Sequence, residues 1–124
     1  MKLFGTGETG SAGERMAARF LKKKGYKIIR RNCRSSMGEI DLVMRDRDEV
    51  VFVEVKTRAS RQWGEPEQAV NRAKQRRISL QAMRFATRHN LRERPLRFDV
   101  VAVVLADGDA PRITHYPDAF PLSV

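Results

Sequence analysis

Charged residues occupy alternate positions of two otherwise apolar segments. Glu39 and Asp41 lie in the first segment, and Glu54 and Lys56 lie in the second. Both segments have the pattern of β-strands, in which side chains two positions apart share a face. Glu39 and Asp41 therefore point the same way, and so do Glu54 and Lys56. Burying such charges is costly unless they are paired or coordinate a metal. The pattern indicates a divalent metal facing a phosphodiester, which is the chemistry of a metal-dependent nuclease.

The spacing of the carboxylates favours a shared cation. Twelve residues separate Asp41 from Glu54, so a hairpin can place them on neighbouring strands. Adjacent carboxylates repel one another unless a cation lies between them. Mg²⁺ prefers oxygen ligands and keeps several waters, so two carboxylates and the backbone carbonyl of Val55 would suit it. The ammonium of Lys56 would stabilise the negative charge that develops on the phosphate.

The elements that must position these residues follow from apolar periodicity and from helix and turn signals. Ser11 and Glu14 have the spacing of a capping box, Gly25 is suited to end a helix, and Pro66 is suited to begin one. Residues 32–37 and 58–65 are expected to be loops. The expected helices and strands are, in order, helix 12–24, strands 26–31, 38–44 and 50–57, helix 66–89, and strands 97–105 and 112–116.

This order predicts an α/β fold with a three-layer core, in which a mixed central sheet is flanked by helices. The core order is α-β-β-β-α-β, followed by one short strand. At 124 residues the chain has the size of one domain. Residues 1–11 are polar and glycine-rich and are expected to form a mobile tail, which leaves 12–124 as a single nuclease-like domain.

The amino-acid composition limits the kinds of partner and the cellular location to expect. The chain has 25 Lys and Arg against 15 Asp and Glu, a net charge of +10, which favours a polyanionic partner such as nucleic acid. No apolar run approaches the ~20 residues of a membrane span, and no amphipathic apolar face suggests membrane binding. The N-terminus lacks the apolar region of a signal peptide. A single cysteine cannot form an internal disulfide, so a cytoplasmic location is expected.

Motifs spread along the chain resemble the YraN family of small bacterial proteins, which are similar to archaeal Holliday junction resolvases. That family falls within the PD-(D/E)xK, restriction-endonuclease-like superfamily. The residues that carry the resemblance are Gly13-Glu14, Ala17, Leu21, Gly25-Tyr26, Asn32-Cys33-Arg34, Gly38-Glu39-Ile40-Asp41-Leu42, Val53-Glu54-Val55-Lys56-Thr57-Arg58 and Arg97-Phe98-Asp99-Val100. Ile40 stands where the superfamily's name places proline, and Cys33 stands where an aromatic residue is often found. The resemblance implies the nuclease fold and phosphodiester hydrolysis of DNA with Mg²⁺ or Mn²⁺, on branched or repair and recombination intermediates.

The candidate catalytic residues are therefore Asp41, Glu54 and Lys56, supported by Glu39 and Glu14. The metal ligands would be Asp41, Glu54, the carbonyl of Val55 and Glu14, since the superfamily often places a first-helix glutamate by the metal. Three alternatives stay open. Asp41 and Glu54 can instead form a structural ion-pair cluster with Lys56 and Arg58. Glu39 can be a solvated residue at a strand end, and Glu14 can serve only in the capping box.

The candidate nucleic-acid contacts are Arg58, Lys74, Arg77, Arg34 and Trp63. Lys74 and Arg77 lie three positions apart on the expected second helix and so share a face that suits a phosphate. Trp63 can stack on a base, or it can anchor its loop. Any single arginine of a basic surface can be merely solvated.

Several other polar residues have ordinary explanations. Asp99 lies among apolar residues of a strand, where it can support the site from behind or pair with Arg97. One cysteine and two scattered histidines do not make a zinc site, and Cys33 reads as a small packed residue.

Two further readings concern activity and assembly. A nuclease scaffold can also bind nucleic acid with little cleavage and recruit a DNA-processing partner. Junction resolvases work as symmetric dimers, which makes a homodimer an expectation, with the apolar tail 117–122 as its candidate face.

Overall fold

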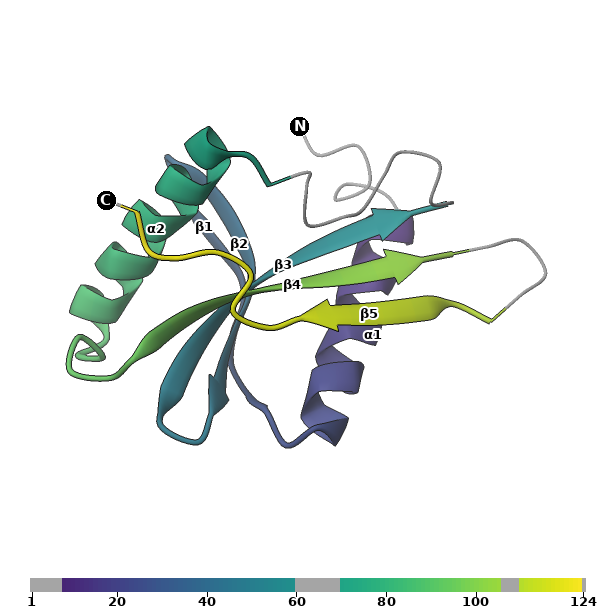
Figure 1. Ribbon diagram of the computed structural model, residues 1–124, viewed down its shortest axis with the longest axis horizontal. Helices are drawn as coiled ribbons and strands as arrows, with labels where there is room; N and C mark the ends of the chain where they lie inside the picture. Colours follow the sequence, from purple (N-terminus) through teal and green to yellow (C-terminus); the bar gives the residue numbers. More distant parts are fainter. Residues whose placement is uncertain (1–7, 60–69, 106–109, 124) are drawn as a thin grey trace.

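Two helices cover opposite faces of a five-stranded sheet (Figure 1). The computed structural model describes residues 8–59, 70–105 and 110–123, with side chains from residue 12 onward. The sheet order is β1-β2-β3-β4-β5, in which β3 and β4 are parallel and every other neighbouring pair is antiparallel. The predicted α/β architecture with a mixed central sheet is therefore confirmed. The elements are α1 (Glu8–Lys23), β1 (Lys27–Ser35), β2 (Gly38–Asp46), β3 (Glu49–Arg58), α2 (Arg72–Arg88), β4 (Leu96–Val104) and β5 (Arg112–Tyr116).

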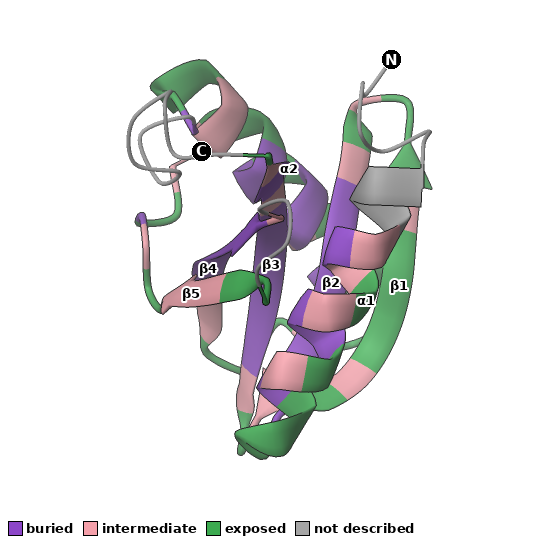
Figure 2. Cartoon of the chain, turned by 90° about the vertical axis from the view of Figure 1, so that its right-hand side faces the viewer, coloured by how far each residue is buried: buried purple, intermediate pink, exposed green. Residues whose placement is uncertain are grey.

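The apolar residues of β3 and β4 build a core on each face of the sheet. Alternate residues of a strand point to opposite faces, so a nearly continuous apolar run needs cover on both sides. Val51, Val53 and Val55 pack beneath α1 with Ala17 and Leu21. The residues between them face α2, where the second core includes Val50, Phe52, Ile78, Phe85 and Phe98. Figure 2 shows the central strands buried between the helices, whereas β1 is largely exposed at the edge.

The first strand extends further than the sequence predicted. β1 continues to Ser35 and pairs with β2 as far as Ser35 opposite Gly38, so the loop expected over 32–37 is wrong for its first four residues. Only Ser36 and Met37 form the turn. The polar residues of this strand lie at the sheet edge, where pairing with β2 satisfies the backbone without demanding apolar side chains. Pairing with a neighbour therefore overrides the local preference for a loop.

The starts of both helices also differ from the expected ones. α1 begins at Glu8, so Ser11 lies inside the helix instead of at its N-cap; an acidic residue in the first turn is favourable there. α2 begins at Arg72, and the side chain of Asn71 accepts a hydrogen bond from the Lys74 amide at 2.9 Å. Asparagine is among the best N-cap residues. Pro66, the expected start, lies outside the described residues, and no helix within them is long and apolar enough to cross a membrane.

The sheet divides in the middle of β2 and β3. Their pairing runs from Asp46 opposite Glu49 to Leu42 opposite Val53 and goes no further. Beyond this point β2 continues beside β1, while β3 continues beside β4 as far as Arg58. In Figure 1, β1 and β2 rise toward α2, and β3, β4 and β5 run to the other side. The division places the charged residues of both strands at the junction of the two arms.

Candidate functional site

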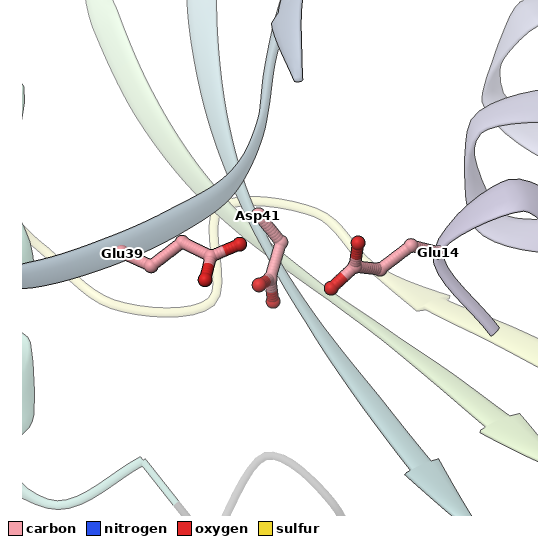
Figure 3. Close-up of side chains that lie close together, drawn as sticks. All are labelled: Glu14, Glu39 and Asp41. Carbon is pink, nitrogen blue, oxygen red and sulfur yellow. The ribbon is translucent and has the colours of Figure 1, made fainter. Parts of the chain in front are cut away.

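Three carboxylates from two elements converge where the sheet divides. Glu39 and Asp41 come from β2, and Glu14 comes from α1. One oxygen of each lies within 4.8 Å of an oxygen of the other two, and Figure 3 shows the three side chains pointing toward one another. Glu39 and Asp41 share a face, as strand alternation predicts, and Glu14 projects toward the sheet from the helix. We call these three residues the acidic cluster.

A close contact between α1 and β3 brings Glu14 to the cluster. A Cβ atom added to Gly13 would lie 1.9 Å from Oγ1 of Thr57 and 3.0 Å from its Cβ. Only a residue without a side chain lets the helix approach β3 this closely. The following residue, Glu14, then reaches the junction. In the sequence Gly13 stands out only as part of a motif, although its contact with Thr57 sets the position of Glu14.

Asn32 joins two members of the acidic cluster and was missed by the sequence analysis. With its amide nitrogen facing the carboxylates, Asn32 donates to Glu39 at 2.8 Å and to Glu14 at 3.0 Å. Its φ of 50° lies in the left-handed region, which asparagine tolerates better than most residues. The two hydrogen bonds hold Glu14 and Glu39 together despite their like charge. Because residue 32 was expected in a loop, its alignment with Asp41 across the strand pair was not foreseen.

Asp41 replaces the missing backbone pairing between β2 and β3. The carboxylate is 2% exposed, and its Oδ2 accepts a hydrogen bond of 2.8 Å from the amide of Val55. This amide belongs to the part of β3 that no longer pairs with β2. The carbonyl of a strand residue faces the same edge as its amide, so the Val55 carbonyl also faces the arm that carries Asp41. That orientation suits a ligand of a metal bound beside Asp41, which is the role expected for this carbonyl.

Glu54 lies beside two lysines rather than within the acidic cluster. Its carboxylate is 2.6 Å from Nζ of Lys74 and 3.4 Å from Nζ of Lys56, and its side chain is 10% exposed. Burial, followed by the neighbouring Lys74 ammonium, lowers the pKa of Lys56. Burial would also lower the pKa of Lys74, but the charge of Glu54 outweighs it and raises that pKa. Lys74 therefore binds Glu54 in addition to lying near the expected phosphate position.

A cleft between the β1–β2 turn and α2 connects these two groups of charges. Its volume is about 380 Å³. Asp41 and Glu54 both line it, as their positions beside the division of the sheet require. Lys74 and Arg77 reach it from one face of α2, in agreement with their helical spacing. We call this hollow the α2 cleft, and its full lining is Met37, Gly38, Glu39, Asp41, Glu54, Lys74, Arg77, Ile78 and Gln81.

The remaining predicted contacts lie at or beyond the margins of the cleft. Arg34 is 79% exposed on its side chain, with Nε 3.7 Å from a Glu39 oxygen, an arrangement that contributes little to stability in solvent. Arg58 ends β3 and is half-buried. Neither residue lines the α2 cleft. Trp63 lies outside the described residues.

A second buried charge network lies on the α1 face of the sheet. Asp99 is fully buried and accepts hydrogen bonds from Arg97 at 2.9 and 3.0 Å and from His115 at 2.6 Å. Arg97 also reaches Glu49 at 2.8 Å. Burial alone would raise the pKa of Asp99, but the bonds from His115, Arg97 and the Asp118 amide hold it below its ordinary value. The open question about Asp99 is thus answered: it pairs with Arg97, with His115 as a further partner.

The chemistry of the acidic cluster suits a hard divalent cation. Carboxylate oxygens are preferred ligands of Mg²⁺ and Mn²⁺, and three of them lie close enough to share one ion. Like charges at this separation repel one another, and a bound cation would offset that repulsion. Lys74 lines the α2 cleft and can approach an anion there, and Lys56 lies at the same Glu54 carboxylate. The donor set therefore fits the cofactor expected from the sequence.

Comparison with known proteins identifies the family. A family model described as "Uncharacterised protein family UPF0102" matches residues 13–103. A UPF0102 protein of Trichlorobacter lovleyi is 47% identical over 99% of this chain and 99% of its own length. The UPF0102 protein GSU0650 of Geobacter sulfurreducens is 46% identical over 92% of this chain and 89% of its own, and a Rhodococcus opacus relative is 46% identical over 90% and 94%. The matched residues include every member of the acidic cluster, and the chain belongs to the family UPF0102, which is the YraN family.

Proposed function

We propose that this protein is a metal-dependent endonuclease that hydrolyses phosphodiester bonds of DNA. The observation that carries the proposal is the convergence of Glu14, Glu39 and Asp41 within 4.8 Å of one another, beside the lysines at Glu54. Carboxylates and ammonium groups serve opposite needs of phosphodiester hydrolysis. The first can hold a cation, and the second can hold the phosphate. The net charge of +10 supports a polyanionic substrate.

Each residue has a distinct part in the proposed reaction. The acidic cluster would hold Mg²⁺ or Mn²⁺, with the Val55 carbonyl nearby. Glu54 would become a further ligand of the metal if a bound phosphate drew Lys56 and Lys74 away from its carboxylate. A bound metal of this kind polarises the phosphate and lowers the pKa of a coordinated water. Lys56, whose pKa is lowered by burial and by Lys74, would contact the scissile phosphate or the attacking water. Arg77 would orient the phosphate from the wall of the α2 cleft.

Branched DNA, including repair and recombination intermediates, is the proposed substrate class. This part of the proposal rests on the resemblance to junction resolvases. The position of the acidic cluster supports it in one respect, because the cluster lies where the two arms of the sheet divide. A backbone that is exposed at a branch or an end reaches such a position more readily than one held within a regular duplex.

A second function is favoured by the pairing of Glu54. Its carboxylate is already neutralised by two ammonium groups, so one expected metal ligand has competing partners. A protein that kept this pairing would bind nucleic acid on a nuclease scaffold without cleaving it, and it would act by recruiting a DNA-processing partner. The two functions differ in one measurable property, which is metal-dependent cleavage.

The test is a cleavage assay with the purified chain. Labelled four-way junction, flap, single-strand and duplex DNA are incubated with Mg²⁺, Mn²⁺ or EDTA. We expect cleavage only with a metal, and loss of that cleavage in Lys56→Ala. Lys27→Ala is the matched control. Lys27 begins β1, where the backbone lies opposite Arg45 of β2, and it is therefore at the other end of this strand pair from Glu39. Binding without cleavage under every metal would replace the endonuclease with the recruitment function.

Asp41→Asn separates chemistry from folding. The side-chain oxygen of asparagine can still accept the hydrogen bond that the Val55 amide donates to Asp41 at 2.8 Å. It carries no negative charge to hold a cation. We expect cleavage to be abolished while DNA binding is kept or becomes tighter, because a cluster with one charge fewer repels phosphate less. Circular dichroism confirms that the variant is folded. Wild-type cleavage by folded Asp41→Asn would refute the proposed role of the acidic cluster.

A further inference from the structure

A second hollow, lined only by basic residues, lies on the other side of the acidic cluster from the α2 cleft. It lies along α1 where the exposed surface of the helix borders β1, and its volume is about 470 Å³. Figure 2 shows α1 beside β1, with exposed and half-exposed residues along the outer side of the helix. We call this hollow the basic furrow. Its lining residues are Arg15, Arg19, Lys22, Lys23 and Arg31.

The basic furrow leads into the acidic cluster. A smaller hollow of about 180 Å³ is lined by Arg15 and Arg31, which also line the furrow, and by Glu14 and Asn32, which belong to or bridge the cluster. The two hollows therefore share a wall. A chain that lies in the furrow and continues along this wall arrives at Glu14. From there the cluster members Glu39 and Asp41 line the α2 cleft on the far side.

Within the part of the chain that the structure describes, no ion pair joins a basic side chain of the furrow to a carboxylate. The ion pairs among the described residues join other side chains, including Arg34, Lys56, Lys74 and Arg97. Arg15 and Arg19, and likewise Arg19 and Lys23, are four positions apart on the helix, a spacing at which like charges destabilise it. An anionic ligand would remove this repulsion.

We propose that the basic furrow binds the sugar-phosphate backbone of the DNA strand whose phosphate lies at the acidic cluster. This inference rests on the proposed nuclease function and adds the path of the substrate. From Arg15 to Lys23 the helix rises by about 12 Å, which corresponds to roughly three or four nucleotides of one strand at ~3.4 Å each. The strand thus runs from the furrow, past the cluster, into the α2 cleft. The expected contacts are to phosphates, so the furrow contributes affinity and direction rather than sequence specificity.

The inference is tested by measuring DNA binding without metal. Fluorescence anisotropy of a labelled flap or single-strand oligonucleotide is recorded in EDTA over a series of salt concentrations. The variant Arg19→Gln/Lys22→Gln/Lys23→Gln removes three charges of the furrow and leaves the residues next to the cluster intact. We expect affinity to fall on the order of tenfold or more, and the slope of log K against log salt to become shallower by about 2 to 3.

The matched control removes the same charge elsewhere. Arg84→Gln/Arg88→Gln/Arg92→Gln changes three exposed arginines of α2 and the turn that follows it, and none of them lines the furrow, the α2 cleft or the smaller hollow. We expect this variant to lose clearly less affinity and salt dependence than the furrow variant. Thermal unfolding checks both folds, and Arg19→Gln alone, in mid-helix, gives a mild second variant with a slope change of about one.

The outcomes separate this inference from the proposed function. The furrow proposal is overturned if the furrow variant binds DNA as tightly as the wild type, or if the control variant loses as much affinity as the furrow variant. The cleavage assay then still decides whether the protein is a nuclease. Selective loss in the furrow variant supports the furrow even if no metal gives cleavage. An absence of any wild-type binding to DNA overturns the furrow and the nucleic-acid function together.

Discussion

Replacing Gly13 by alanine tests the contact that brings Glu14 to the acidic cluster. Inside an ordinary helix, this change would stabilise the protein by up to about 1 kcal/mol, because alanine is the better helix former. Here the new Cβ would lie 1.9 Å from Oγ1, 3.0 Å from Cβ and 3.1 Å from Cγ2 of Thr57. The two effects have opposite signs, so the sign of the measured change in stability shows which of them dominates.

The size of the effect follows from the freedom of Thr57. Rotation about χ1 could move Oγ1 away, but the Cβ contact at 3.0 Å would stay, and Thr57 is 8% exposed in packed surroundings with a stiff, β-branched side chain. The helix must therefore move outward by about 1 Å or more to restore ordinary contact distances. Overpacking of this kind costs about 1–3 kcal/mol. After subtraction of the helix gain, we expect Gly13→Ala to lower the free energy of unfolding by up to about 2 kcal/mol.

The assay is chemical denaturation of the variants of a double-mutant cycle. Thr57→Ala removes the atoms at 1.9 and 3.1 Å, so Gly13→Ala should cost less in its presence, and the coupling between the two positions should be about 1 kcal/mol. The outward movement also carries Glu14 away from Asp41, so metal-dependent cleavage should fall more than stability alone explains. A Gly13→Ala protein as stable as the wild type or more stable, with zero coupling to Thr57, would refute the reasoning.

Three further perturbations test other parts of the structure. Asp99→Asn should cost about 2–3 kcal/mol at neutral pH, because it removes the buried charge that Arg97 and His115 bind, while Arg97 keeps its contact with Glu49. The lowered pKa of Asp99 means that its stabilisation is present above its ordinary pKa and is lost as pH falls below about 4, so urea titrations of the wild type and Asp99→Asn should converge in acid. Asn71→Ala removes the N-cap of α2 and should cost about 1 kcal/mol, whereas Asn71→Asp should not; equal stability of all three proteins would exclude the cap. Lys74→Gln leaves the buried Glu54 with one ammonium at 3.4 Å and should lower the free energy of unfolding by about 2 kcal/mol in chemical denaturation. The loss is smaller than for a fully buried pair because Lys74 is partly exposed. The control Arg76→Gln changes an exposed residue of the same helix and should leave the stability unchanged.

Local patterns in the sequence were sufficient to place the side chains of the candidate site on the correct faces. Alternation along a strand put Glu39 beside Asp41 and Glu54 beside Lys56, and helical periodicity turned Glu14 toward the sheet. These relations depend on residues a few positions apart and on the regular geometry of each element. The α/β architecture followed from the order of the elements in the same way.

The features that were not predicted depend on contacts between distant residues. The polar segment that contains Asn32 becomes strand only because β2 lies beside it, and no local pattern indicates a left-handed asparagine that binds two carboxylates. The end of pairing after Leu42 and Val53 follows from the replacement of a backbone partner by the Asp41 carboxylate. Likewise, Lys74 was foreseen as a phosphate contact, while its pairing with Glu54 depends on how α2 packs on the sheet.

The division of the sheet also determines how the site can move. In a continuous sheet, widening a gap between two central strands breaks several hydrogen bonds of the ladder at once, each with a buried group left unpaired. Here the ladder between β2 and β3 already ends at Leu42 and Val53. Among the described contacts, the hydrogen bond from Val55 to Asp41 spans the two arms beyond that pair. Separating the two arms beyond this pair would therefore break fewer backbone hydrogen bonds than separating two continuous strands.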